Sequence, residues 1–277
     1  MIGLVSGLAS VTTRAAASFQ GAFTPESISN IALWLKVNTN ITADENSAAV
    51  AYGTAHTSNG GDMVNADRIN AWNAAGSTSI NAVQTTTGDK PRWDTSSGNL
   101  GSVRSPGANK HMDLSSAITF DANTDFTVVI RFKPDVATDS RALLGDTDSE
   151  FIRNHDGDTI RLKTDAGTND FNSGTALESE KIVTMIMVRS DGATGNINCF
   201  MRSNVSSYFD GTATGTAFGS TSQDNTEIVI SNIMAQADNS GEFDGNVYDI
   251  IIYDGTAVTS AQRQQLFDYI DAQDYPQ

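Results

Sequence analysis

Apolar and polar residues alternate with a period of two through much of the second half of the chain. The clearest case is the run 126–132. Because successive side chains of a strand point to opposite faces, its apolar residues share one face, which we expect to lie in a sandwich core. These residues are Phe126, Val128, Ile130 and Phe132. Further strands are expected at 31–36, 141–144, 150–153, 159–163, 182–188, 196–202, 227–231 and 247–253.

The spacing of these runs favours an antiparallel β-sandwich, since short strands about ten residues apart are typical of that architecture. Asp156-Gly157 supplies a hairpin signal between two of the expected strands. One helix is expected near the end of the chain. There Thr259 and Gln262 form a capping box, and an apolar stripe follows at Leu266, Phe267 and Ile270.

Residues 38–110 are rich in Asn, Thr, Ser, Gly and Ala. We expect long surface loops there, pinned by Trp72 and Trp93. The chain shows no Pro-rich linker, so we predict one domain over 23–277, preceded by an N-terminal arm over 1–22.

The arm carries apolar side chains at Ile2, Leu4, Val5 and Leu8. These residues imitate a secretory signal, but no Lys or Arg precedes Arg14. We expect the arm to be retained and to anchor the protein on a neighbouring subunit.

Charge and cysteine content narrow the function classes. Seventeen basic and thirty-three acidic residues give a formal net charge of −16, which repels phosphate backbones and anionic lipid surfaces. Nucleic acid is therefore excluded as a partner, whereas neutral sugars and divalent cations remain possible ligands. The alternative is that the acidic residues serve only to keep the protein soluble. Cys199 is the only cysteine, so no intrachain disulfide forms. No run reaches the roughly 18 apolar residues of a membrane span.

The order of these segments resembles the laminin G-like branch of the concanavalin A-like lectin/glucanase superfamily. The resemblance covers about residues 23–273 and is most specific in the final strand and helix, 243–253 and 259–266. It implies an all-β, concanavalin A-like antiparallel β-sandwich (jelly roll), with a short C-terminal helix and an extended N-terminal arm. Such a sandwich hosts lectins, adhesins, hydrolases and scaffolds.

The leader and the junction 22–35 also resemble virion structural proteins of tailed phages. That resemblance implies a non-enzymatic capsid decoration or tail protein, located in the virion. Its partners would be other virion proteins, bound through the arm, and a host-surface polysaccharide. A homo-oligomer is expected. The alternatives are a free carbohydrate-binding or adhesion module and a glycan-cleaving enzyme.

One pair of carboxylates is the best signal for an enzyme. Glu242 and Asp244 are two residues apart, as in the Glu-x-Asp-x-x-Glu signature of the superfamily's glucanases, but Val247 stands at the last position. Gly245-Asn246 is expected to form a turn or bulge. Because the proton donor is missing, we assign no catalytic residue.

Asp146, Asp148 and Glu150 alternate along an expected loop. Since hard cations bind several oxygens, these residues are candidate calcium ligands; the alternative is that they are ordinary turn residues and that the protein needs no cofactor.

Sugar binding needs exposed aromatic rings, for which Trp72, Trp93 and Tyr208 are the candidates. Packing in the core is the alternative for each. His56, His111 and His155 are scattered, and we expect them to face solvent.

Overall fold

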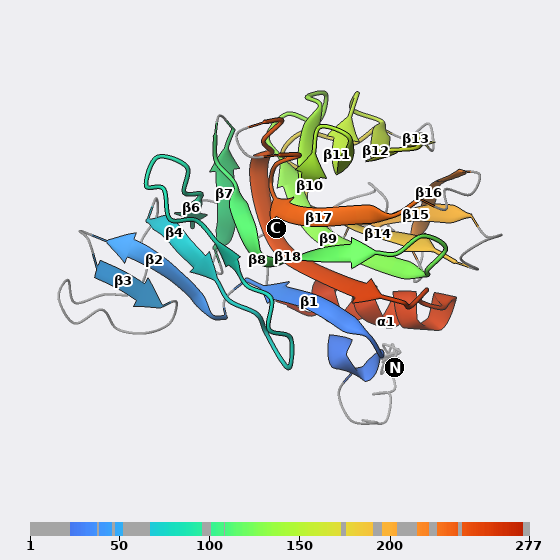
Figure 1. Cartoon of the computed structure of the whole chain (residues 1–277), viewed down its shortest axis with the longest axis horizontal. Helices are drawn as coiled ribbons and strands as arrows, with labels where there is room; N and C mark the ends of the chain where they lie inside the picture. Colours follow the sequence, from blue (N-terminus) through green and yellow to red (C-terminus); the bar gives the residue numbers. More distant parts are fainter. Residues whose placement is uncertain are drawn as a thin grey trace, which may run out of the picture.

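Two antiparallel sheets packed face to face form the protein, and short strands join them along one side (Figure 1). In this computed structural model the predicted sandwich with a single C-terminal helix is confirmed. The structure describes residues 23–37, 39–45, 48–51, 67–95, 101–107, 109–172, 176–190, 196–203, 215–221, 226–237 and 240–273.

The helix-side sheet carries the C-terminal helix on its outer face. Its hydrogen-bonded order is β1 (Ile31–Lys36), β18 (Asp244–Asp254), β9 (Phe126–Pro134), β14 (Val183–Arg189), β15 (Ile197–Arg202) and β16 (Thr216–Thr221). A short 3-10 helix, η1 (Pro25–Ser27), precedes β1.

The far sheet faces it across the core. Its order is β8 (Met112–Phe120), β17 (Ile228–Ile233), β10 (Arg141–Thr147), β11 (Glu150–His155), β12 (Thr159–Thr164) and β13 (Gly167–Asn172).

Residues 38–110, expected to be long surface loops, instead contain short strands, the last four of which join the two sheets. They are β2 (Ile41–Glu45), β3 (Ala48–Ala51), β4 (Arg68–Trp72), β5 (Ala82–Val83), β6 (Arg92–Asp94) and β7 (Ser102–Pro106). β7 pairs with β18 and β6, β6 pairs with β4, and β4 continues through β5 to β8. The prediction was wrong because these strands have two to five residues, too few to show a period.

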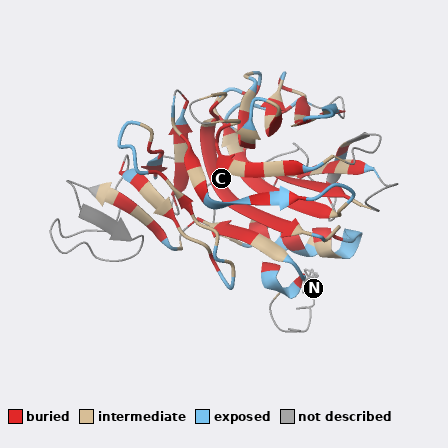
Figure 2. Ribbon diagram, in the orientation of Figure 1, coloured by how far each residue is buried: buried red, intermediate tan, exposed pale blue. Residues whose placement is uncertain are grey.

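The face of β9 predicted to be apolar lies in the core between the sheets, as expected. Phe126 stacks on Phe120 of β8 with the ring centroids 4.6 Å apart. Phe132 meets Phe243 edge to face at 5.9 Å. The buried residues in Figure 2 run along the middle of both sheets.

The last strand differs from the prediction at its start. β18 begins at Asp244, and Gly245 and Asn246 pair regularly with both β7 and β9 instead of forming the expected turn or bulge. The irregularity lies between Val247 and Asp249, where the register with β9 shifts by one residue.

The helix α1 (Ser260–Asp271) closes the outer face of the helix-side sheet. Its predicted capping box is confirmed: Gln262 N donates to Thr259 Oγ1 at 3.3 Å, and Thr259 N donates to Gln262 Oε1 at 2.9 Å. Leu266, Phe267 and Ile270 are fully buried against the sheet. The predicted apolar stripe is therefore the packing surface.

Charged groups are buried beneath this helix. Arg131 of β9 is fully buried and donates from Nη1 to Asp271 Oδ1 of α1 at 2.9 Å. Asp249 of β18 is 1% exposed, and within the described residues its carboxylate has no well-formed hydrogen bond, although the backbone N–H of Val37 lies near it. Burial raises the pKa of Asp249 well above its ordinary value, although the charges of Lys36 and Arg131 oppose the shift.

This raised pKa predicts how stability depends on pH. The favourable contribution of protonated Asp249 is complete below the unfolded-state pKa of about 3.9 and is lost as pH rises through the higher folded-state pKa. Asp249→Asn should therefore raise the melting temperature at pH 8 by a few degrees, at about 2–4 °C per kcal/mol for a chain of this size. The gain should shrink toward pH 5 in calorimetric scans, and an equal gain at both pH values would contradict the expectation.

Candidate functional site

A row of polar side chains crosses the strands that join the sheets. The register makes Arg68 a direct partner of Arg92, and Arg92 a direct partner of Arg104. Directly opposed residues of an antiparallel pair point to the same face. The row continues to Asp44 on β2 at one end and to Asn246 on β18 at the other. We call these five residues the polar row.

The polar row faces away from the core. The residues that alternate with it, Ile69, Trp93, Val103 and Val247, are at most 1% exposed and belong to the core cluster. Because side chains of a strand alternate between its faces, the row lies on the outer face. Arg68 and Arg92 are exposed, in keeping with this position. In Figure 1 the strands β2, β4 and β6 lie at the opposite end of the molecule from α1.

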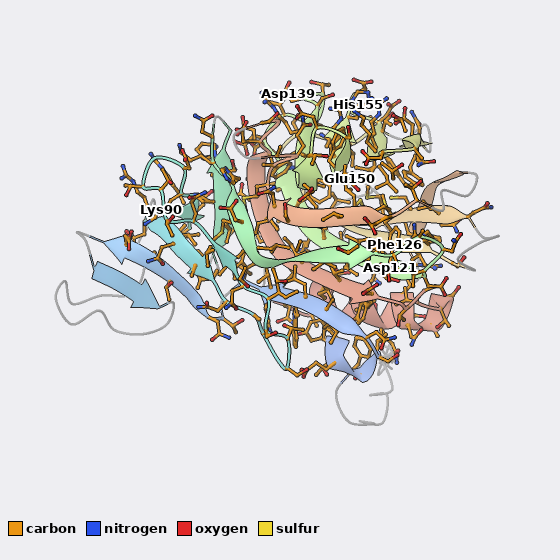
Figure 3. The ribbon with its side chains drawn as sticks, in the orientation of Figure 1. Lys90, Asp121, Phe126, Asp139, Glu150 and His155 are labelled. Carbon is orange, nitrogen blue, oxygen red and sulfur yellow. The ribbon has the colours of Figure 1, made fainter. Side chains whose placement is uncertain are left out.

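One end of the row is held by a hydrogen-bonded network. Asn70 of β4 donates from Nδ2 to Asp44 Oδ1 at 2.9 Å, and its Oδ1 accepts from Thr42 Oγ1 at 2.6 Å. Lys90, which is labelled in Figure 3, is 5% exposed, and its Nζ pairs with the other oxygen of Asp44. Both oxygens of Asp44 are therefore engaged, and the amide of Asn70 is fixed in one orientation.

The other end of the row is buried and ordered. Asn246 is fully buried and donates from Nδ2 to Asp94 Oδ2 at 2.8 Å and to Ser102 Oγ at 2.7 Å. Arg104 forms an ion pair with Asp135, which follows β9. The side chain of Arg104 is 38% exposed and stands opposite the buried Asn246 in the register of the two strands.

The middle of the row is electrostatically unfavourable by itself. Like charges on directly opposed residues of neighbouring strands destabilise a sheet. Arg68 and Arg92 form no ion pair with another described residue that would offset this repulsion. The row therefore presents guanidinium groups that can bind hydrogen-bond acceptors.

The two tryptophans predicted to be sugar platforms are core residues. Trp72 is 0% and Trp93 1% exposed, so neither ring has a face for a sugar, and this prediction was wrong. Trp72 Nε1 donates to the Lys36 carbonyl at 3.0 Å. Trp93 lies under Gly101, whose positive φ of 68° and close approach to the ring leave no room for a Cβ atom. Tyr208 and His56 lie outside the described residues.

The structure does not bring the three calcium candidates into one ligand set. Asp146, Asp148 and Glu150 surround the turn between β10 and β11. Asp148 Oδ1 accepts from Gln236 Nε2 at 2.8 Å, and Glu150 is 8% exposed, accepting from Val229 N at 3.3 Å. Across the described ranges, no three His, Cys, Asp or Glu side chains gather as a metal site.

The two carboxylates considered for catalysis differ in how far they are buried. Glu242 is 6% exposed, whereas Asp244 is half-buried. Burial, and next the charge of Asp135, raise the pKa of Asp244, which Arg104 opposes. Val247, at the position where the glucanase signature has its last acid, is buried opposite Phe132.

The two described histidines do not face solvent freely, which corrects the prediction. His111 is 3% exposed. The side chain of His155 is 15% exposed and lies between Ser140 Oγ, 2.6 Å from Nδ1, and Asp156 Oδ2, 2.8 Å from Nε2. Burial, and next the positive charges of Arg161 and Arg153, lower the pKa of His155.

Sequence reasoning missed the arginines of the polar row. The run Arg68-Ile69-Asn70 alternates polar and apolar residues, as does Arg92-Trp93-Asp94, and this was the available signal. Each run is too short to separate a strand from a loop, and no sequence pattern shows that β4, β6 and β7 pair in this order.

No helix among the described residues is long and apolar enough to cross a membrane. Comparison with curated proteins finds none that is significantly similar in sequence.

Several solved structures share the fold at low identity. An arabinofuranosidase complexed with arabinofuranosyl-alpha-1,2-xylobiose is 13% identical with a TM-score of 0.59, over 87% of this chain and 62% of that chain. A GH54 α-L-arabinofuranosidase soaked with a cyclic sulfate inhibitor is 12% identical with a TM-score of 0.58, over 88% of this chain and 62% of that chain. This chain thus spans less than two thirds of those enzymes, and the likeness shows the fold alone.

The match to a family model is more extensive. The model described as the concanavalin A-like lectin/glucanases superfamily, laminin G type, matches residues 106–262, which run from the end of β7 into α1. Because this match covers more than half of the chain, the protein belongs to the concanavalin A-like lectin/glucanase superfamily.

Proposed function

We propose that this protein is a carbohydrate-binding module that holds a glycan on the polar row without cleaving it. Sugar hydroxyls both donate and accept hydrogen bonds, so a saccharide site needs donors and acceptors side by side. The polar row and the adjacent Asn70 supply guanidinium, amide and carboxylate groups on one outer face. Membership of a lectin-like superfamily supports the same function.

The observation that carries the proposal is the fixed orientation of Asn70 and Asp44. Thr42, Lys90 and the two residues themselves form a continuous network of side chains that links β2 and β4. Groups that are already ordered lose little conformational entropy when a ligand binds, which raises affinity for a given number of contacts.

Binding is favoured over hydrolysis by the environment of β18. In a retaining glycosidase, two carboxyl groups lie about 5 Å apart on either side of the scissile bond. The last acid of the glucanase signature is replaced by Val247, whose side chain packs in the core. The described part of this strand thus offers no proton donor at that position.

A location in a virion is our second proposal, and it rests on the apolar pattern of the N-terminal arm. Ile2, Leu4, Val5 and Leu8 lie outside the described residues, so the support comes from the sequence alone. In this proposal the arm binds other virion proteins or a second copy of the chain, and the sandwich contacts the host surface.

Glycan binding is tested on an array of neutral and acidic oligosaccharides, followed by affinity electrophoresis in gels that contain the polysaccharides retained. Asn70→Ala should weaken retention about tenfold, which corresponds to about 1.4 kcal/mol of binding free energy. The substitution removes one polar group of the site and the hydrogen bonds that hold Asp44 and Thr42 in place. Asn172→Ala is the matched control, since Asn172 also forms a cross-strand hydrogen bond, at 3.2 Å, but on the far sheet. Equal loss in both variants, or no retention of the parent chain by any glycan, would refute the proposal.

The role of the arm is tested by comparing the full chain with a chain that starts at Phe23. Native mass spectrometry should show an oligomer for the full chain and a monomer for the shortened one, because the apolar side chains of the arm are removed. Thermal unfolding serves as the control for an intact sandwich. A shortened chain that assembles as the full chain does would overturn the expectation.

A further inference from the structure

Three arginines of the polar row stand side by side on one outer face. Arg68, Arg92 and Arg104 come from the adjacent strands β4, β6 and β7, and each is the direct register partner of the next. Like charges placed directly opposite each other destabilise a sheet. Because arginine stays charged at any physiological pH, the repulsion is not relieved by deprotonation.

Two of the three arginines, Arg68 and Arg92, form no ion pair with a described carboxylate, because other groups already engage the carboxylates nearby. Asp44 binds Lys90 with one oxygen and Asn70 with the other. Asp94 is 6% exposed and accepts from the buried Asn246. Asp135 pairs with Arg104. The positive charges of Arg68 and Arg92 therefore remain exposed.

The exposed charges of Arg68 and Arg92 have the opposite sign to the formal net charge of the chain, which is −16. The overall field repels polyanions, so nonspecific attraction of an acidic polymer is weak. Any preference for anions must arise from a local arrangement, and the arginine cluster is such an arrangement.

We propose that the arginine cluster of the polar row selects acidic polysaccharides, whose sugars carry carboxylate or sulfate groups. This inference rests on the proposed glycan-binding function and names its ligand class. A guanidinium group binds a carboxylate or a sulfate through two parallel hydrogen bonds. Arginines on neighbouring strands can hold successive anionic groups of one chain, while the second N–H of the Asn70 amide can donate to a sugar hydroxyl beside them.

The test uses pairs of polymers that differ only in charge. Dextran sulfate is compared with dextran, and polygalacturonate with its methyl ester, by titration calorimetry on the full chain in 50 and 150 mM salt. The dextran pair tests recognition of sulfate groups, and the polygalacturonate pair tests recognition of carboxylate groups. Polyglutamate reports attraction to an anionic polymer without sugars. At least one acidic polysaccharide should bind ten times more tightly than its neutral counterpart and than polyglutamate.

Variants connect this preference to the cluster. Arg92→Gln should weaken binding of the acidic polymer at least tenfold, and Arg92→Lys should lose part of the affinity because the two-pronged hydrogen bonding is gone. Arg92 is exposed, so these variants leave the core intact. Arg161→Gln is the control: it removes the same charge from β12 of the far sheet, where Arg161 pairs with Asp170 at 2.6 Å.

The outcomes separate this inference from the proposed function. If neutral and acidic polymers of a pair bind equally, or if Arg92→Gln and Arg161→Gln have equal effects, the inference is overturned while glycan binding stands. If no polysaccharide binds at all, both fail.

Discussion

The pairing of β18 along both of its edges is the interaction on which the rest of the structure depends. β9 pairs with one edge over nearly the whole strand, while β1 and β7 divide the other edge between them. The nine inner residues of this eleven-residue strand are all buried. Loss of this strand would separate the N-terminal segments from the rest of the helix-side sheet, because β1 and β7 reach β9 only through β18.

The division of that edge also explains why the outer face of the helix-side sheet has two different halves. Beside β1 it is covered by α1, whose apolar stripe encloses Arg131 and Asp249. Beside β7 the same face continues onto β6, β4 and β2 and carries the polar row. The shift in register between Val247 and Asp249 lies where the two halves meet.

The polar row combines two properties that the sandwich itself does not require. Its ends are ordered by buried groups, Lys90 at one end and Asn246 at the other, whereas Arg68 and Arg92 in its middle are exposed. A sheet selected for stability alone would alternate charge across its strands, because opposed like charges cost free energy. This contrast favours a surface that recognises a ligand, and the family supplies a chemical class for that ligand.

The sequence by itself determined the elements whose pattern extends over several residues, namely β9 and the capped helix α1. It also determined the resemblance of the chain to the superfamily. Repeated alternation and a capping box are local signals, so they can be read without knowing which distant segments pair. Only the tertiary structure decided that Trp72 and Trp93 are buried, and that Arg68, Arg92 and Arg104 stand in one row. Those facts depend on the register between strands of two to five residues from distant parts of the chain, and such pairing leaves no periodic signal in the segments themselves.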